Sequence, residues 1–110
     1  MGRFVKGDVV IVPFPFSDLS MSKRRPALVV AELPGDDRIL CQITSQTVRV
    51  RFAVAIADAD FASGGLKKPS HVRPNRIFTA DSGIMLGVAG RLDQGKIDEV
   101  IDAIVRIVTA

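Results

Sequence analysis

The chain has 110 residues, of which 47% are hydrophobic and 25% charged, so we expect one globular domain over residues 1–110 and not a disordered or fibrous protein. The net charge of +3 is modest, but basic residues gather at 23–25, 49–51 and 67–76, which favours an anionic partner. With one cysteine and no stretch near the roughly 20 apolar residues that span a bilayer, a cytoplasmic protein without a membrane partner is expected.

The N-terminal part of the chain is predicted to form a short strand and a loop. Gly7 and Asp8 open the apolar run from Val9 to Val12, which is typical of a strand. The strand is expected to end at Pro13, because this proline and Pro15 remove backbone donors that a central strand needs. Residues 17–23 are polar and are predicted to form a loop.

A hairpin is predicted next. The run from Pro26 to Ala31 is fully apolar and is predicted to be a buried second strand. Residues 33–37 read Leu-Pro-Gly-Asp-Asp, a sequence with strong turn chemistry. We therefore expect the chain to return through a third strand at residues 38–44.

The middle of the chain is predicted to hold further short strands. Alternation at residues 48–52 indicates a half-exposed strand that continues into 54–56. Residues 63–65, Ser-Gly-Gly, are expected to form a flexible turn. Residues 66–78 contain two prolines and should form an edge or interrupted strand, and residues 84–89 can supply one more.

The last segment changes from a strand to a helix period. Asp93 is a suitable N-cap residue for this helix. The apolar residues recur at the spacing of one helix face: Ile97, Val100, Ile101, Ile104, Val105 and Val108. The whole pattern predicts a mainly β protein, a small and strongly bent barrel closed by a C-terminal helix.

Familiar cofactor chemistry has no support in the sequence. One histidine and one cysteine cannot make a zinc site of usual composition. Cys41 stands in an apolar run, so we expect a buried and inert thiol. Gly64 and Gly65 lack the lysine and the helix start of a phosphate-binding loop. We therefore expect neither a metal nor a cofactor.

Two polar segments flank the predicted second and third strands. Lys23, Arg24 and Arg25 precede the second strand, which would hold Arg25 at a rigid strand entrance. Residues 44–46 (Thr-Ser-Gln) follow the third strand and offer hydroxyls and an amide where the ladder stops. Each segment also has an ordinary interpretation, as a solvated loop arginine and a common strand residue. The residues alone indicate an anion site and go no further.

Four blocks in this order resemble the MazF/PemK toxin family: Gly7–Ser20, Lys23–Val30, Ile43–Gln46 and Val72–Thr79. The resemblance implies an SH3-like barrel of the CcdB/MazF type, assembled as a homodimer. It implies a toxin of a type II toxin–antitoxin system that cleaves single-stranded RNA at specific sequences, with a cognate antitoxin occupying the same groove. It also implies metal-independent attack by the RNA's own 2′-hydroxyl, which leaves a 2′,3′-cyclic phosphate.

The resemblance also assigns residues. Arg25 and Thr44 match the usual catalytic pair of the family. Some members use an arginine and an aspartate two residues apart in the fourth block, where this chain has Arg73 and Asn75, so that carboxylate is missing. The residues expected to contact RNA are Asp18, Lys23, Arg24, Ser45, Gln46, His71, Arg73, Asn75 and Arg76.

The general base stays open at the level of sequence. Arg25 rarely gives up a proton, because a guanidinium remains charged in proteins. Asp18 and His71 are the candidates, although a turn carboxylate and an exposed histidine are equally ordinary interpretations. Two other functions share the predicted fold: a CcdB-like gyrase poison, and a non-catalytic member that binds nucleic acid.

Overall fold

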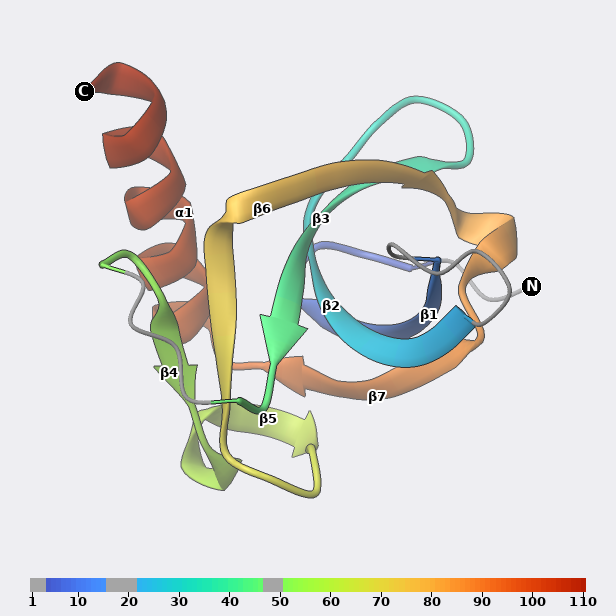
Figure 1. Cartoon of the computed structure of the whole chain (residues 1–110), viewed down its shortest axis with the longest axis horizontal. Helices are drawn as coiled ribbons and strands as arrows, with labels where there is room; N and C mark the ends of the chain where they lie inside the picture. The colour runs from blue at the N-terminus through green and yellow to red at the C-terminus, as the bar shows by residue number, and fades with distance from the viewer. Residues whose placement is uncertain (1–3, 16–21, 47–50) are drawn as a thin grey trace.

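The computed structural model describes residues 4–15, 22–46 and 51–110. Within these ranges the strands form one antiparallel sheet of seven strands in the order β4-β6-β3-β2-β1-β7-β5. The sheet curls into a half-barrel with α1 beside β4 and β6 (Figure 1). The elements are β1 (Asp8–Pro15), β2 (Ser22–Glu32), β3 (Asp37–Thr44), β4 (Val54–Ile56), η1 (Asp58–Asp60), β5 (Phe61–Gly64), β6 (Ser70–Asp81), η2 (Ser82–Ile84), β7 (Gly87–Leu92) and α1 (Gln94–Thr109). The predicted mainly β barrel with a C-terminal helix is thus confirmed.

The curled sheet has a hydrophobic core on each face, because alternate residues of a strand point to opposite sides. Beneath α1 the core contains Val9, Leu28, Cys41, Ile43, Val72, Ile97 and Val100, among others. Inside the curl a second core contains Val10, Val12, Ala27, Val29, Leu40 and Met85. Both faces of β1, β2 and β3 are therefore covered, which explains why the second strand is apolar without alternation.

The first strand does not end at its prolines. β1 continues to Pro15, with Pro13 opposite Arg24. The prediction failed because β7 pairs with β1 only over Asp8–Ile11. Beyond Ile11, the described strands pair with β1 on one side alone, through β2, and a proline there can leave the ladder intact.

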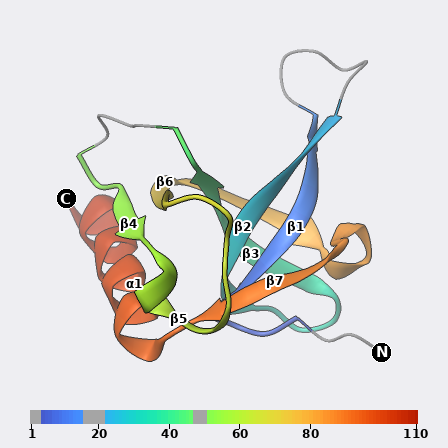
Figure 2. The same cartoon turned by 90° about the horizontal axis from the view of Figure 1, so that it is seen from below.

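The second strand begins earlier than predicted and carries the basic residues. β2 starts at Ser22, so Lys23, Arg24 and Arg25 lie within a strand and not in a loop. Its pairing with β1 runs to Ser22 opposite Pro15, whereas its pairing with β3 stops at Ala27 opposite Gln42. The first part of β2 therefore leaves β3 and rises with β1 as a two-stranded arm (Figure 2).

The proline-containing sixth strand is interrupted and is not an edge. β6 lies between β4 and β3. Its register shifts where Ile77 lies opposite Cys41 but Arg73 lies opposite Gln42, so residues 74–76 bulge from the ladder. Of the strand predicted at 48–56, residues 48–50 lie outside the described residues, Arg51 and Phe52 form a turn, and 54–56 is confirmed as β4.

The segment predicted as a flexible Ser-Gly-Gly turn is mostly strand. Ser63 and Gly64 belong to β5, which pairs with β7. Gly64 has a φ of 64°, and a Cβ on it would collide with the carbonyl oxygen of Ala89. The glycine is needed for this close approach of two backbones and not for flexibility. The strand predicted at 84–89 begins only at Gly87, because Ser82–Ile84 forms the turn η2.

The C-terminal helix is confirmed together with its cap. The Asp93 carboxylate accepts a hydrogen bond from the Lys96 amide at 2.9 Å. The apolar stripe is covered in its first half, where Ile97 and Val100 are buried, whereas Val105 and Val108 are exposed. Among the described helices, none combines the length and apolarity required to cross a membrane.

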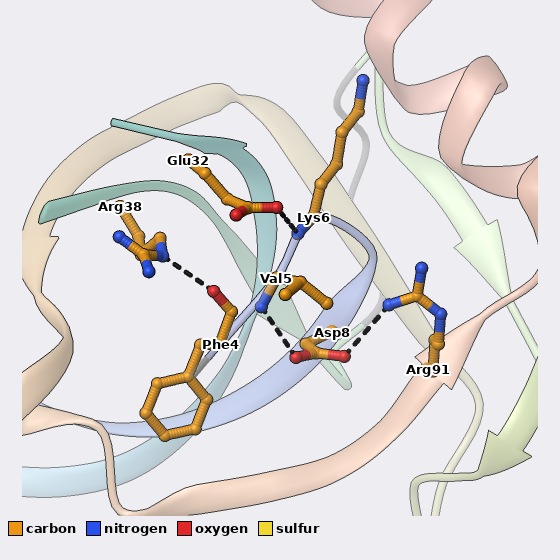
Figure 3. Close-up of polar contacts among 7 residues, drawn as sticks. All are labelled: Phe4, Val5, Lys6, Asp8, Glu32, Arg38 and Arg91. Carbon is orange, nitrogen blue, oxygen red and sulfur yellow. Dashed lines mark hydrogen bonds and ion pairs between the residues drawn. The ribbon is translucent and has the colours of Figure 1, made fainter. Parts of the chain in front are cut away.

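Polar contacts fix the N-terminal segment (Figure 3), which lies at the end of the sheet opposite the arm (Figure 2). The buried Arg38 donates from Nε to the Phe4 carbonyl at 2.7 Å. Asp8 accepts from the Val5 amide at 2.9 Å and pairs with Arg91 at 3.2 Å. Because the buried Arg38 and Asp8 both have hydrogen-bond partners here, this end of the sheet is held in place.

The Cys41 thiol should be inert in the folded protein. Burial raises the pKa of Cys41 to about 12 from 9.0, because desolvation disfavours the thiolate. At pH 8 a thiol reagent should label the native protein about a thousandfold more slowly than the unfolded chain, since the thiolate is the reactive form. The unfolded chain loses the thiol proton near pH 9 and the folded chain near pH 12. The contribution of Cys41 to the free energy of unfolding is therefore fully present below pH 9 and is lost as the pH rises from 9 to 12. Equal labelling rates in buffer and in guanidinium would contradict the buried position.

Candidate functional site

A pocket of about 360 Å³ lies where β2 and β3 part. One wall is the arm side of β2, with Lys23, Arg24, Arg25 and Pro26. Ile43 and Ser45 contribute from the end of β3, and Leu66, Lys67, Lys68 and Ser70 come from the segment that leads into β6. We call this pocket the basic notch. It exists because the β2–β3 ladder ends at Ala27 and Gln42 while both chains continue.

The notch carries a concentrated positive charge. Of the described residues that line it, five are Lys or Arg and none is acidic. Lys23, Arg24, Lys67 and Lys68 form no ion pair with a described residue. Cations gathered without carboxylates create a local positive potential that attracts anions. The arrangement therefore suits a phosphate-bearing ligand.

A second group of polar side chains lies on the face of the sheet that lines the curl. Thr44 lies opposite His71, and Gln42 lies opposite Arg73 in the β3–β6 ladder. Opposed residues of antiparallel strands point to the same face, and so do residues two apart on one strand. These four side chains form what we call the polar row.

Arg25 borders both features. Continuing the register of Ala27 with Gln42 places Arg25 toward Thr44, on the same face of the sheet, although the strands have separated there. Arg25 also lines the basic notch. Thr44 is 7% exposed, and its Oγ1 accepts a hydrogen bond from the Gln46 amide at 3.2 Å. This bond leaves the hydroxyl hydrogen of Thr44 available for donation.

Two atoms of the polar row are buried without a hydrogen-bond partner in the described part of the chain. They are Nδ1 of His71 and Nε of Arg73. Buried polar atoms in folded proteins are nearly always hydrogen-bonded, because an unsatisfied group keeps its full desolvation cost. Their positions two residues apart on β6 mark this face as one that a ligand or partner would complete.

The structure gathers most of the residues that the sequence predicted. Lys23, Arg24, Arg25 and Ser45 meet in the notch, and Thr44, His71 and Arg73 meet in the polar row. Gln46 is exposed just beyond β3, while Asn75 and Arg76 are exposed on the bulge of β6. Asp18 lies outside the described residues.

Sequence reasoning missed three residues of the site. Lys67 and Lys68 line the notch, and Gln42 belongs to the polar row. The lysines stand in the basic cluster at 67–76, which was a usable signal, but Gln42 is one polar residue within an apolar strand. Within the described ranges no group of three or more His, Cys, Asp or Glu side chains could hold a metal ion.

Comparison with protein families gives a match over residues 5–108 to the model of the PemK-like, MazF-like toxins of type II toxin–antitoxin systems. None of the curated proteins matches the chain significantly in sequence.

Several solved structures are similar in fold. MazF from Deinococcus radiodurans matches at a TM-score of 0.79 with 17% identity, over 100% of both chains. An endoribonuclease in complex with its cognate antitoxin, from a mycobacterial species, matches at a TM-score of 0.75 with 14% identity, over 99% of this chain and 96% of that one. The Mycobacterium tuberculosis toxin MazF-mt6 matches at 0.73 with 19% identity, over 93% and 96%.

Proposed function

Since the chain belongs to the family of PemK-like, MazF-like toxins of type II toxin–antitoxin systems, we propose that it is an endoribonuclease that cleaves single-stranded RNA. Relatives in fold are described as endoribonucleases. The observation that carries the proposal is the position of Arg25, between a notch rich in cations and a row of proton donors and acceptors. A phosphate held there would meet both charge stabilisation and groups that can move protons.

In the proposed reaction the ribose 2′-oxygen attacks the adjacent phosphorus and the bond from phosphorus to the 5′-oxygen breaks. The product ends are a 2′,3′-cyclic phosphate and a 5′-hydroxyl. Arg25 binds the nonbridging oxygens, because a planar guanidinium matches two phosphate oxygens at once. Thr44 donates its free hydroxyl hydrogen to one of the same oxygens. The attacking 2′-hydroxyl explains why RNA and not DNA would be cut.

The two proton transfers need a base for the 2′-hydroxyl and an acid for the leaving oxygen. We assign one of them to His71, which lies opposite Thr44 on the same face and whose Nδ1 has no hydrogen-bond partner among the described residues. An imidazole can exchange protons near neutral pH. Asn75 cannot take this role, because a side-chain amide does not accept a proton near neutral pH. Asn75 also lies on the exposed bulge of β6.

The partners follow from the family and the surface. We propose that a cognate antitoxin binds this toxin in the cytoplasm, as MazE binds MazF in a Deinococcus radiodurans complex.

We also propose that the protein forms a homodimer. Ile84, Leu86 and Val88 are exposed in the short segment that leads into β7 and in β7 itself, and exposed apolar residues that gather in one segment favour contact with a second copy.

The proposal is tested by incubating the purified protein with single-stranded RNA in excess EDTA. The expected result is cleavage at defined positions, with no cleavage of DNA of the same sequence. RNA left intact over a range of sequences, together with binding to DNA gyrase, would contradict the proposal and favour a gyrase poison.

A further inference from the structure

We propose that Lys67 and Lys68 form a second phosphate site, which holds an RNA phosphate beyond the one that is cleaved. This inference rests on the proposed function, because it assigns the notch to the RNA substrate. Its consequence is that efficient cleavage requires at least one more nucleotide on the side of the strand that enters the notch.

The two lysines are presented from a fixed segment. Ser70 is buried and donates from Oγ to the Lys68 carbonyl at 3.0 Å. The Gly65 amide donates to the Ala89 carbonyl at 3.2 Å, next to the close contact that Gly64 makes with β7. Pro69 restricts the backbone between these anchors. A binding group supported in this way loses little conformational entropy when a ligand binds.

The charge of the notch comes from segments that are distant in the sequence. Lys23 and Arg24 stand on one wall, and Lys67 and Lys68 stand on the other. None of these four side chains forms an ion pair with a described residue. Like charges that converge without carboxylates repel one another, and an anion between the walls relieves this repulsion.

The place of the notch relative to Arg25 identifies the anion. Arg25 lines the notch and, by strand alternation, belongs to the same face of the sheet as Thr44. An RNA strand with its reacting phosphate at Arg25 would therefore continue between the two basic walls of the notch. The volume of about 360 Å³ lies within the roughly 300–1,000 Å³ of small-ligand pockets. Pro26, Ile43 and Leu66 add apolar surface against which a sugar or base can pack.

The test compares the Lys67→Gln/Lys68→Gln variant with the control Lys6→Gln/Arg106→Gln, which removes the same charge from exposed positions outside the notch. The probe is a fluorescent single-stranded 2′-fluoro RNA, which lacks the attacking hydroxyl. We expect the notch variant to bind about tenfold more weakly at 0.1 M salt, with a slope of log K against log salt reduced by about 1.4, or about 0.7 for each lost contact. The control should change both values much less.

A second arm uses cleavable RNAs shortened one nucleotide at a time from each end. When the nucleotide whose phosphate binds in the notch is removed, kcat/KM of the wild type should fall about tenfold. The same shortening should leave kcat/KM of the notch variant unchanged, because this variant already lacks the contact with that phosphate.

Equal salt slopes for the notch variant and the control would overturn the second phosphate site. So would unchanged RNA binding combined with weaker binding of the antitoxin, which would make the notch a protein contact. If the wild type binds the probe through the lysines but cleaves no RNA, the proposed cleavage fails, and the notch is then an RNA-binding site without a cleaved phosphate beside it.

Discussion

The Arg25→Ala variant should cleave single-stranded RNA at least about a thousandfold more slowly than the wild type under single-turnover conditions. A guanidinium that stabilises the charge of a transferring phosphoryl group contributes about 10³ to 10⁵ in rate. Arg25 is the cation that borders both the notch and the polar row. The measurement is the rate constant at saturating enzyme, so that weaker binding does not mask the chemical step.

The neighbouring Arg24→Ala variant is the matched control, because it removes the same charge one residue away. Alternation along β2 turns Arg24 to the face opposite Arg25. It should raise KM and leave the single-turnover rate constant nearly unchanged. Arg25→Lys should recover only part of the rate, because an ammonium cannot bind two phosphate oxygens in the planar geometry of a guanidinium. Equal rate losses for Arg24→Ala and Arg25→Ala would reduce Arg25 to a general electrostatic contact.

The Thr44→Val variant should lower the same rate constant by about a hundredfold, which is the scale of losing one donor to a developing oxyanion. Valine keeps the shape of the buried side chain, and the hydroxyl lost in the free protein accepts one hydrogen bond, from the Gln46 amide. Thermal unfolding should therefore show only a small loss of stability beside the large loss in rate.

The Thr44→Ser variant separates the catalytic role of the hydroxyl from its structural one. Serine keeps the hydroxyl and should retain most of the cleavage rate. If Thr44→Val cleaves RNA as fast as the wild type, the Thr44 hydroxyl serves only to accept the hydrogen bond from the Gln46 amide. Stabilisation of the developing charge on the phosphate would then rest on Arg25 alone.

Much of the fold was predictable because local signals and tertiary packing agree. The hairpin of β2 and β3 follows from its Pro-Gly-Asp turn, and α1 follows from its period and from Asp93 as N-cap. The path of β1 past Pro13 was not predictable. Whether a proline interrupts a ladder depends on which neighbour is present, and β7 arrives from far along the chain.

The role of Gly64 was hidden for a related reason. A glycine pair in a sequence has the same appearance whether it provides flexibility or permits two backbones to meet. Here the contact with Ala89 of β7 decides between them, and that contact exists only once β5 and β7 have paired.

Some residues of the candidate site could likewise be predicted from the sequence, and the grouping of others could not. Arg25 and Thr44 could be predicted because each lies in a sequence block that resembles a known family. Gln42 and Arg73 become neighbours only through the register of β3 with β6, and the bulge at residues 74–76 shifts that register. A count along the sequence cannot locate a bulge, so the polar row appears only in the folded sheet.

The most direct measurement of the central claim is the chemistry of the RNA ends after incubation with the wild type and with Arg25→Ala in excess EDTA, read by mass spectrometry. For the wild type we predict a 2′,3′-cyclic phosphate on the upstream fragment and a 5′-hydroxyl on the downstream fragment, and for the variant we predict intact RNA. A 5′-phosphate on the downstream fragment, or the same fragments from the variant, would contradict attack by the 2′-hydroxyl at a phosphate held by Arg25.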